Sequence, residues 1–111
     1  MLIARNNGAV AGTVQLNLEN RANGRHRAEV MKLIVHSAQR RRGIAQALMN
    51  AIEAEARQAN RTTLVLDTRI DDVAEKLYLK LGWIAAGTIP RYAANADGTI
   101  DTTVIMYKLL D

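Results

Sequence analysis

The chain has 111 residues, of which 49% are hydrophobic and 23% charged, and its formal charge is +4, from 15 Lys and Arg against 11 Asp and Glu. This length predicts a single domain, and the composition excludes a globally disordered chain. The sequence contains no Cys, which excludes disulfides, thiolate nucleophiles and thiolate metal ligands together. No apolar run approaches the roughly 20 residues of a membrane span and the N-terminus lacks a signal-peptide core, so we expect a cytoplasmic protein without a membrane partner.

The first third of the chain predicts an antiparallel meander of three strands. These strands are residues 2–5, 9–18 and 25–35. The first turn contains Asn7-Gly8, which is a strong hairpin signal because both residues accept positive φ. A second, polar turn runs from Asn20 to Gly24. Val30 to Val35 is mostly apolar and β-branched, which predicts a central strand that is covered on both faces.

A helix is predicted to follow this strand after a polar turn. Its apolar residues form one stripe on an otherwise charged segment, namely Ile44, Ala45, Leu48, Met49, Ile52 and Ala56. The turn before the helix contains Arg40, Arg41, Arg42 and Gly43. Backbone N–H groups at a helix start are free and the helix dipole is positive there, so this basic turn is suited to a phosphate or pyrophosphate. An ordinary strand-to-helix turn is the alternative interpretation of Gly43.

The second half of the chain predicts a strand, a helix and two final strands. These strands are residues 63–67, 83–89 and 102–110. The first helix should connect the first of them to the strand before it in a right-handed, parallel βαβ unit. Asp71 or Asp72 is expected to cap the second helix, and Gly82 to end it. The inner face of that helix is predicted to consist of Val73, Leu77, Tyr78 and Leu81. A turn at Asp97-Gly98 interrupts the long final connection.

Two segments resemble signatures of the GNAT family of N-acetyltransferases. Arg40-Arg41-Arg42-Gly43-Ile44-Ala45 resembles the Q/R-x-x-G-x-G/A signature, with Ala45 where many members have a second Gly. Downstream, Leu77-Tyr78 and Gly82-Trp83 match the pattern A-x-x-L-Y-x-x-x-G-F, with Trp in place of Phe. The resemblance runs from about Met1 to Leu110 and is closest to the tabtoxin-resistance type of acetyltransferase.

The resemblance implies an α/β fold built on a mixed α+β sheet, the acyl-CoA N-acyltransferase fold. About six to seven strands and two main helices are expected in one domain over residues 1–111. The chain begins at what resembles the family's second strand, so the fold is expected to be N-terminally truncated and to lack helices that form a wall of the acceptor pocket. A second copy would cover the exposed core and the unpaired edge, and we therefore expect a homodimer.

The resemblance also implies that the co-substrate is acetyl-CoA and that no metal takes part. In the family the pantetheine arm pairs with strand backbone like an added strand, which points here to Leu33, Ile34 and Val35. The other implied donor-binding residues belong to the basic turn and the helix start: Arg40, Arg41, Arg42, Gly43, Ile44, Ala45 and Gln46. Asp71 is a further candidate for contact with the donor, although helix capping also explains it.

Acetyl transfer from a thioester to an amine requires a neutral amine, a stabilised carbonyl oxygen and a proton for the departing thiolate. Tyr78 is the candidate proton donor, and a half-buried core aromatic is the alternative interpretation. A backbone N–H near Val35 is the candidate for polarising the carbonyl. Glu29 and Asp67 are both candidate bases, and each is equally interpretable as a solvated strand-end charge or a salt-bridge partner.

Three functions follow from these patterns. The leading hypothesis is an N-acetyltransferase that moves acetyl from acetyl-CoA to the primary amine of a small molecule by direct attack in a ternary complex. The second is a truncated remnant that binds coenzyme A or itself with little or no catalysis. The third is nucleic-acid binding through Arg40 to Arg42. The moderate charge contains one tight cluster, which favours a small polyanion over a polymer, so we expect no nucleic-acid partner.

Overall fold

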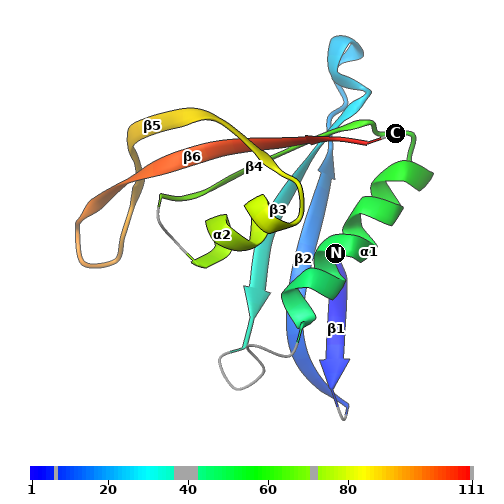
Figure 1. Ribbon diagram of the computed structural model, residues 1–111, viewed down its shortest axis with the longest axis horizontal. Coiled ribbons are helices and arrows are strands. Elements are labelled where there is room, and N and C mark those ends of the chain that lie inside the picture. The colour runs from blue at the N-terminus through cyan, green and yellow to red at the C-terminus, as the bar shows by residue number, and fades with distance from the viewer. Residues whose placement is uncertain (7, 37–42, 71–72, 111) are drawn as a thin grey trace. The chain divides into compact units, whose positions relative to one another are not determined.

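The computed structural model describes residues 1–6, 8–36, 43–70 and 73–110. The strands are β1 (Leu2–Asn6), β2 (Ala9–Leu18), β3 (Arg27–Val35), β4 (Thr63–Arg69), β5 (Ile84–Ala94) and β6 (Ile100–Leu109). The helices are α1 (Ile44–Gln58), α2 (Val73–Lys80) and a short 3-10 helix, η1 (Ala22–Gly24). The strands form a six-stranded sheet in the order β1-β2-β3-β4-β6-β5 (Figure 1). The predicted mixed-sheet α/β fold with two main helices is confirmed.

The chain divides into two compact units. Unit 1 comprises Met1–Leu64 and Leu109–Asp111, and unit 2 comprises Val65–Lys108. Unit 1 contains β1, β2, β3 and α1, whereas unit 2 contains α2 and β5 together with most of β4 and of β6.

Unit 1 is an antiparallel meander with α1 packed on it. Antiparallel pairing runs from Leu2 opposite Val14 to Asn6 opposite Ala9, and Gly8 in the connecting turn has φ 82°, as the hairpin prediction requires. The predicted apolar stripe of α1 is confirmed at its centre, where the buried side chains are Leu48, Met49, Ile52 and Ala56. Glu53 is also buried, at 4% exposure, which the stripe did not predict.

A bulge interrupts β3 close to its C-terminal end. Thr13 of β2 pairs with Ile34 and Gln15 with Met31, so β3 contains one more residue than β2 over this interval. Lys32 lies in the bulge with φ 55°, in the left-handed region. A bulge bends its strand and leaves the extra residue unpaired. The sequence does not mark it, because Lys is not a residue that favours positive φ.

The prediction that β3 is covered on both faces is wrong. Ala28 and Val30 are buried, whereas Lys32 is exposed and Ile34 is 58% exposed. Beyond Val30 the strand is therefore exposed at every second position and is not covered on both faces. On the neighbouring strand, β2 contributes Gly12, where an added Cβ would lie 2.8 Å from the Ile34 carbonyl oxygen. The missing side chain lets the strands and α1 approach closely.

Unit 2 contains a long β5–β6 hairpin whose first strand exceeds its prediction. The expected strand ended at Ile89, but β5 continues through Pro90 to Ala94. Ile89 pairs with Thr103 and Ala93 with Asp101, so β5 contains two extra residues in this interval, and Arg91 there has φ 54°. Pro is tolerated in a strand at a bulge or an edge, and β5 is the last strand of the sheet order.

Helix α2 buries one aromatic residue and exposes the first residue of its predicted inner face. Val73 is 79% exposed, so its assignment to that face is wrong, whereas Tyr78 is only 6% exposed. Gly82 has φ 94° and the Trp83 N–H donates to the Tyr78 carbonyl at 3.0 Å, which confirms the predicted helix end. Trp83 is 2% exposed, and its ring centroid lies 6.0 Å from that of Tyr78.

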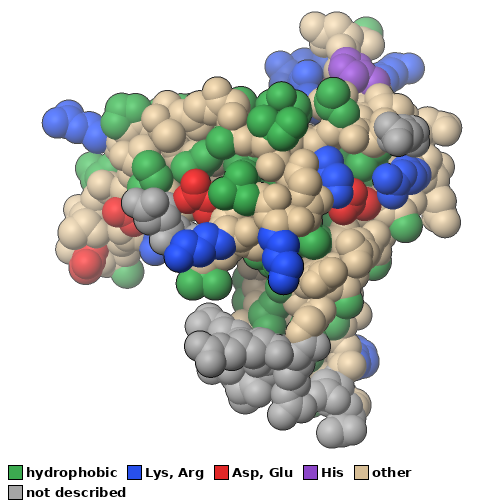
Figure 2. Space-filling model, viewed as in Figure 1, with side chains coloured by type: hydrophobic (Ala, Val, Ile, Leu, Met, Phe, Trp, Pro, Cys, Tyr) green, Lys and Arg blue, Asp and Glu red, His purple; other side chains and the backbone are tan. Residues whose placement is uncertain are grey.

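Apolar side chains are exposed along the β5–β6 hairpin. The space-filling view shows hydrophobic side chains spread over this part of the surface (Figure 2), and the large ones of β5 and β6 that are at least 42% exposed are Ile84, Ile89, Tyr92, Ile100 and Leu109. Their position on the last strand of the sheet order and its partner leaves them uncovered in the single chain. None of the helices within the described ranges is long and apolar enough to cross a membrane.

Candidate active site

The start of α1 presents free backbone donors next to an open glycine. Gly43 is the N-cap with φ 73° and ψ 10°, and no side chain in the described ranges caps the helix. The first turn closes where the Ala47 N–H donates to the Gly43 carbonyl at 3.0 Å. The N–H groups of residues 43–46 therefore precede the helical hydrogen bonds. Among the described residues, an added Cβ on Gly43 would meet nothing within 4 Å, so these residues leave open the space beside the donors.

The predicted donor-binding segment of β3 lies just beyond the bulge. Val35 pairs with Gly12 and Ile34 with Thr13, whereas Leu33 has no partner in the register of β2. The His36 N–H donates to the Ala11 carbonyl at 2.9 Å and continues the ladder past the end of the strand. Leu33, Ile34 and Val35 thus lie in the same unit as the start of α1.

Four of the predicted donor-binding residues lie outside the described residues. They are Arg40, Arg41, Arg42 and Asp71. Of the predicted set, the structure thus places Leu33, Ile34, Val35, Gly43, Ile44, Ala45 and Gln46. Within the described ranges, the anion-binding capacity of this region comes from backbone N–H groups and the helix dipole alone.

The candidate catalytic residues are divided between the two units. Glu29 is half-buried on β3, opposite Asn17, in unit 1. Asp67 is exposed near the end of β4 in unit 2. Tyr78, also in unit 2, is buried in the last turn of α2, against Trp83. Tyr78 is more buried than the half-buried core aromatic that the sequence suggested as one interpretation. Its position fits both that interpretation and the role of proton donor.

A polar corner at the end of β4 was not predicted. In this Arg69 corner, the Arg69 Nε lies 3.7 Å from the Asp101 carboxylate and the Arg69 Nη2 donates to the Asn95 side-chain oxygen. The Asn95 amide in turn donates to Asp101 Oδ2 at 2.8 Å and to the Thr99 hydroxyl at 2.9 Å. The corner therefore joins β4 to both ends of the loop between β5 and β6.

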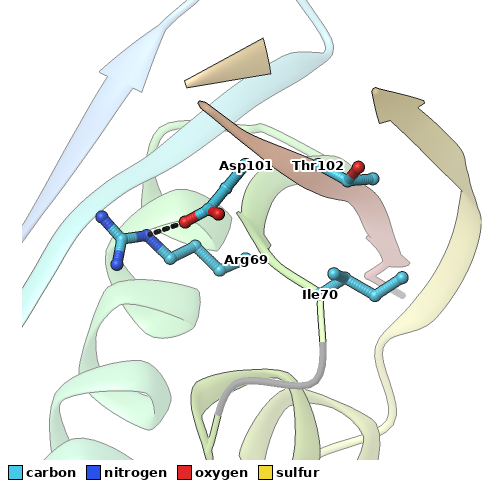
Figure 3. Close-up of a pocket in the computed structure, with 4 residues that line it drawn as sticks. All are labelled: Arg69, Ile70, Asp101 and Thr102. Carbon is cyan, nitrogen blue, oxygen red and sulfur yellow. Dashed lines mark ion pairs between the residues drawn. The ribbon is translucent and has the colours of Figure 1, made fainter. Parts of the chain in front are cut away.

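The Arg69 corner borders an open hollow of about 240 Å³. Its lining consists of Arg69, Ile70, Asp101 and Thr102, and Figure 3 shows the guanidinium and the Asp101 carboxylate turned toward each other. Asp97 lies in the same loop, and its pKa is lowered because the Thr99 hydroxyl and backbone N–H donate hydrogen bonds to it. It therefore stays ionised at neutral pH.

The sequence contained a partial signal for this corner. Asp67 ends a predicted strand and Arg69 follows two residues later, a spacing that places both on one face where the strand continues to Arg69, as β4 does. The partner residues Asn95 and Asp101 are 26 and 32 positions away and lie beyond a strand whose length was not predicted. No group of three or more His, Asp or Glu placed to hold a metal ion occurs in the part of the chain that the structure describes.

The sequence model of the acetyltransferase (GNAT) family matches residues 1–83, and the chain therefore belongs to this family. Solved structures of similar fold agree. An acetyltransferase of the GNAT family from Streptococcus pneumoniae matches with a TM-score of 0.89 and 24% identity, over 97% of this chain and 65% of that one. A Salmonella typhimurium protein solved with its cofactor acetyl-CoA matches with a TM-score of 0.86 and 22% identity, over 98% and 63%.

An aminoglycoside 6'-N-acetyltransferase complexed with coenzyme A also shares the fold, with a TM-score of 0.76 and 21% identity. The match covers 96% of this chain and 70% of that one. The chain thus spans about two thirds of the length of these structures.

Proposed function

We propose that the protein is an acetyl-CoA-dependent N-acetyltransferase that acts as one domain over residues 1–111. The observation that carries this proposal is the open glycine turn at the start of α1, where the N–H groups of residues 43–46 precede the helical hydrogen bonds and no side chain in the described ranges caps them. Such a site is suited to a diphosphate. Membership of the acetyltransferase family and the coenzyme ligands of two structural relatives support acetyl-CoA as the source of that diphosphate.

The donor would be held by backbone more than by side chains. Gly43 has open space where its Cβ would lie, so a phosphate can approach the N–H groups of Ile44, Ala45 and Gln46. Leu33, Ile34 and Val35 offer strand backbone to the pantetheine arm, and the bulge at Lys32 frees a peptide from the ladder nearby. Arg40, Arg41, Arg42 and Asp71 are further proposed contacts.

The bound donor would supply an activated acetyl thioester. In the proposed reaction the amine nitrogen of the acceptor forms a bond to the carbonyl carbon and the carbon–sulfur bond breaks, without a covalent enzyme intermediate. Glu29 or Asp67, directly or through water, accepts the proton that the amine loses, and Tyr78 gives a proton to the departing thiolate. A backbone N–H near Val35 donates a hydrogen bond to the carbonyl oxygen.

The test combines calorimetry with acetyl-CoA and thiol release in the presence of a panel of primary amines. Micromolar binding and amine-dependent thiol release are expected. Binding without turnover would instead favour the alternative function, a protein that binds coenzyme A with little or no catalysis. This alternative is considered because the chain spans about two thirds of the length of its structural relatives. Absence of binding would contradict both functions.

Further proposals concern partners and location. We propose a small-molecule primary amine as the acceptor, a homodimer, a cytoplasmic location, and no metal, nucleic-acid or membrane partner. The exposed Ile3 of β1 and the exposed apolar side chains of β5 support self-association. Light scattering tests it, since a monomer at high micromolar concentration would contradict a homodimer. A relation to the tabtoxin-resistance type stays a prediction.

A further inference from the structure

We propose that Arg69 recognises a carboxylate on the acceptor, so that the acceptor is a free amino acid. This inference rests on the proposed acetyltransferase function for the reaction itself, but the binding that it predicts can be measured without acetyl-CoA. It is carried by the state of the Arg69 guanidinium in the Arg69 corner.

One edge of the Arg69 guanidinium is fixed and the other is available. A guanidinium presents five N–H donors, which form a side edge at Nε and Nη2 and an end edge at Nη1 and Nη2. The side edge of Arg69 faces Asp101 and Asn95. Its Nη1 has no acceptor among the residues that the structure describes, and the side chain is 59% exposed. The end edge can therefore receive a planar, two-oxygen ligand group from solvent.

Among the residues that the structure describes, no carboxylate is hydrogen-bonded to Arg69. The hydrogen bond that it makes within these residues goes to the neutral amide of Asn95, and Asp101 lies at 3.7 Å, beyond hydrogen-bond distance. Arg21 in unit 1 shows the contrast, because its Nε and Nη2 donate to the two oxygens of Glu19 at 3.0 and 3.1 Å. Arg69 makes no such two-oxygen contact on its side edge, so it can make one only through its end edge at Nη1 and Nη2.

The surroundings of Arg69 hold it in place before a ligand arrives. Asn95 is itself fixed by donating to Asp101 and to Thr99, so the guanidinium rests on a connected set of hydrogen bonds. Preorganisation of this kind reduces the entropy lost on binding. A carboxylate about 7 Å from the ligand in water weakens binding by roughly threefold, whereas a two-pronged charged contact strengthens it by roughly tenfold to a hundredfold. The attraction therefore exceeds the repulsion from Asp101. Asp97, whose pKa the charge of Arg69 helps to lower, is a second carboxylate that opposes binding.

The position of Arg69 on its strand connects recognition with chemistry. Asp67 and Arg69 are both exposed, whereas Leu66, which points to the opposite face of β4, is buried. The two charged residues therefore share the exposed face of the strand. Residues two apart on a strand are about 7 Å apart. An acceptor held by its carboxylate at Arg69 would thus lie on the face of β4 that also contains a candidate base. A simple amine would lack this anchor.

The experiment measures binding of the standard amino acids and of their amides to the full chain without acetyl-CoA. NMR signals of the Arg69 side-chain N–H groups and calorimetry are the readouts. At least one free amino acid should bind about tenfold or more tightly than its amide, and Arg69→Gln should remove that difference. Arg69→Lys, which keeps the charge but not the fork, should restore only part of it. Arg21→Gln is the matched control and should leave the binding unchanged.

Two outcomes would overturn the inference. One is that no free amino acid binds more tightly than its amide, and the other is that Arg69→Gln, with an unchanged circular dichroism spectrum, retains the preference. Arg69-dependent binding without thiol release from acetyl-CoA would support the recognition site and contradict the acetyltransferase function. Thiol release that is equal with free amino acids and with their amides would support the acetyltransferase function and contradict the recognition site at Arg69.

Discussion

The start of α1 and the Arg69 corner both offer N–H donors to an anion, but they do so in different ways. At Gly43 the donors are backbone groups of a helix start, whose direction is set by the helix itself. At Arg69 the donors belong to one side chain, whose direction is set by Asn95 and Asp101. Backbone donors survive almost any substitution of neighbouring side chains, whereas side-chain donors disappear with one.

Under the two proposals above, the co-substrate would be bound by backbone donors and the acceptor by a side chain. A co-substrate shared by a whole family is suitably bound by backbone, because the sequence around it can vary without loss of binding. An acceptor that distinguishes one enzyme from another is suitably bound by side chains on a loop, where substitution changes specificity. Each prediction below tests this division, beginning with the largest expected effect.

Tyr78→Phe should separate chemistry from both kinds of recognition. If the Tyr78 hydroxyl protonates the thiolate, its loss lowers turnover by roughly a hundredfold or more. The affinities for acetyl-CoA and for acceptor should stay within about twofold, since the ring remains packed against Trp83. Steady-state kinetics and calorimetry measure both quantities, and unchanged turnover would leave Tyr78 as a core aromatic only.

Gly43→Ala should weaken donor binding through the backbone site. The added methyl group meets no protein atom, but it enters the space beside the free N–H groups, so we expect about a tenfold loss of acetyl-CoA affinity. A positive φ also costs about 1 kcal/mol of stability for Ala. Gly98→Ala is the matched control, because Gly98 has φ 90° and equally open surroundings. It should lose the same stability and bind acetyl-CoA normally; equal losses of affinity would contradict the site.

Glu19→Gln should change the pH dependence of stability and should leave the affinities for acetyl-CoA and for acceptor unchanged. Hydrogen bonds from the Arg21 side chain and backbone lower the pKa of Glu19 from 4.5 to about 2. Because the folded pKa is depressed, the stabilisation is present above pH 4.5 and disappears as the pH falls toward 2. Denaturant unfolding of the wild type should therefore weaken more steeply across this window than that of the variant. Parallel curves would show that the ion pair contributes nothing.

Gln46→Ala should have the smallest effect of the set. The Gln46 side chain is exposed in the first turn of α1, and the substitution keeps its N–H and favours the helix. We expect acetyl-CoA affinity within about twofold of the wild type. A large loss by calorimetry would mean that side chains, and not only the backbone, bind the donor at the helix start.

The fold was predictable where its signals are local. The Asn-Gly hairpin, the stripe of α1 and the Gly82 helix end each depend on residues within one or two turns of chain, and the structure confirms all three. The backbone donor site belongs to this class. A glycine before a helical period already specifies free N–H groups, whatever the rest of the chain does.

The Arg69 corner and the two bulges were not predictable in this way. The position of each depends on how residues of neighbouring strands are paired, and the local sequence specifies that pairing only weakly. The two-residue bulge beyond Ile89 lets β5 pass Pro90, where the local rule ends a strand, and it sets which residues of the β5–β6 loop meet Arg69. Similarly, Val73 has the spacing of an inward residue but lies in the first turn of α2, where the helix exposes it.

The packing of the chain's single tryptophan has a practical consequence. Trp83 is shielded from water directly after α2, with Tyr78 as its ring neighbour. Its emission should therefore be short in wavelength and excitable through the tyrosine. A red shift of this emission on adding coenzyme or amino acid would report loosening of this helix end in the unlabelled native chain. The measurement needs far lower protein concentrations than NMR does.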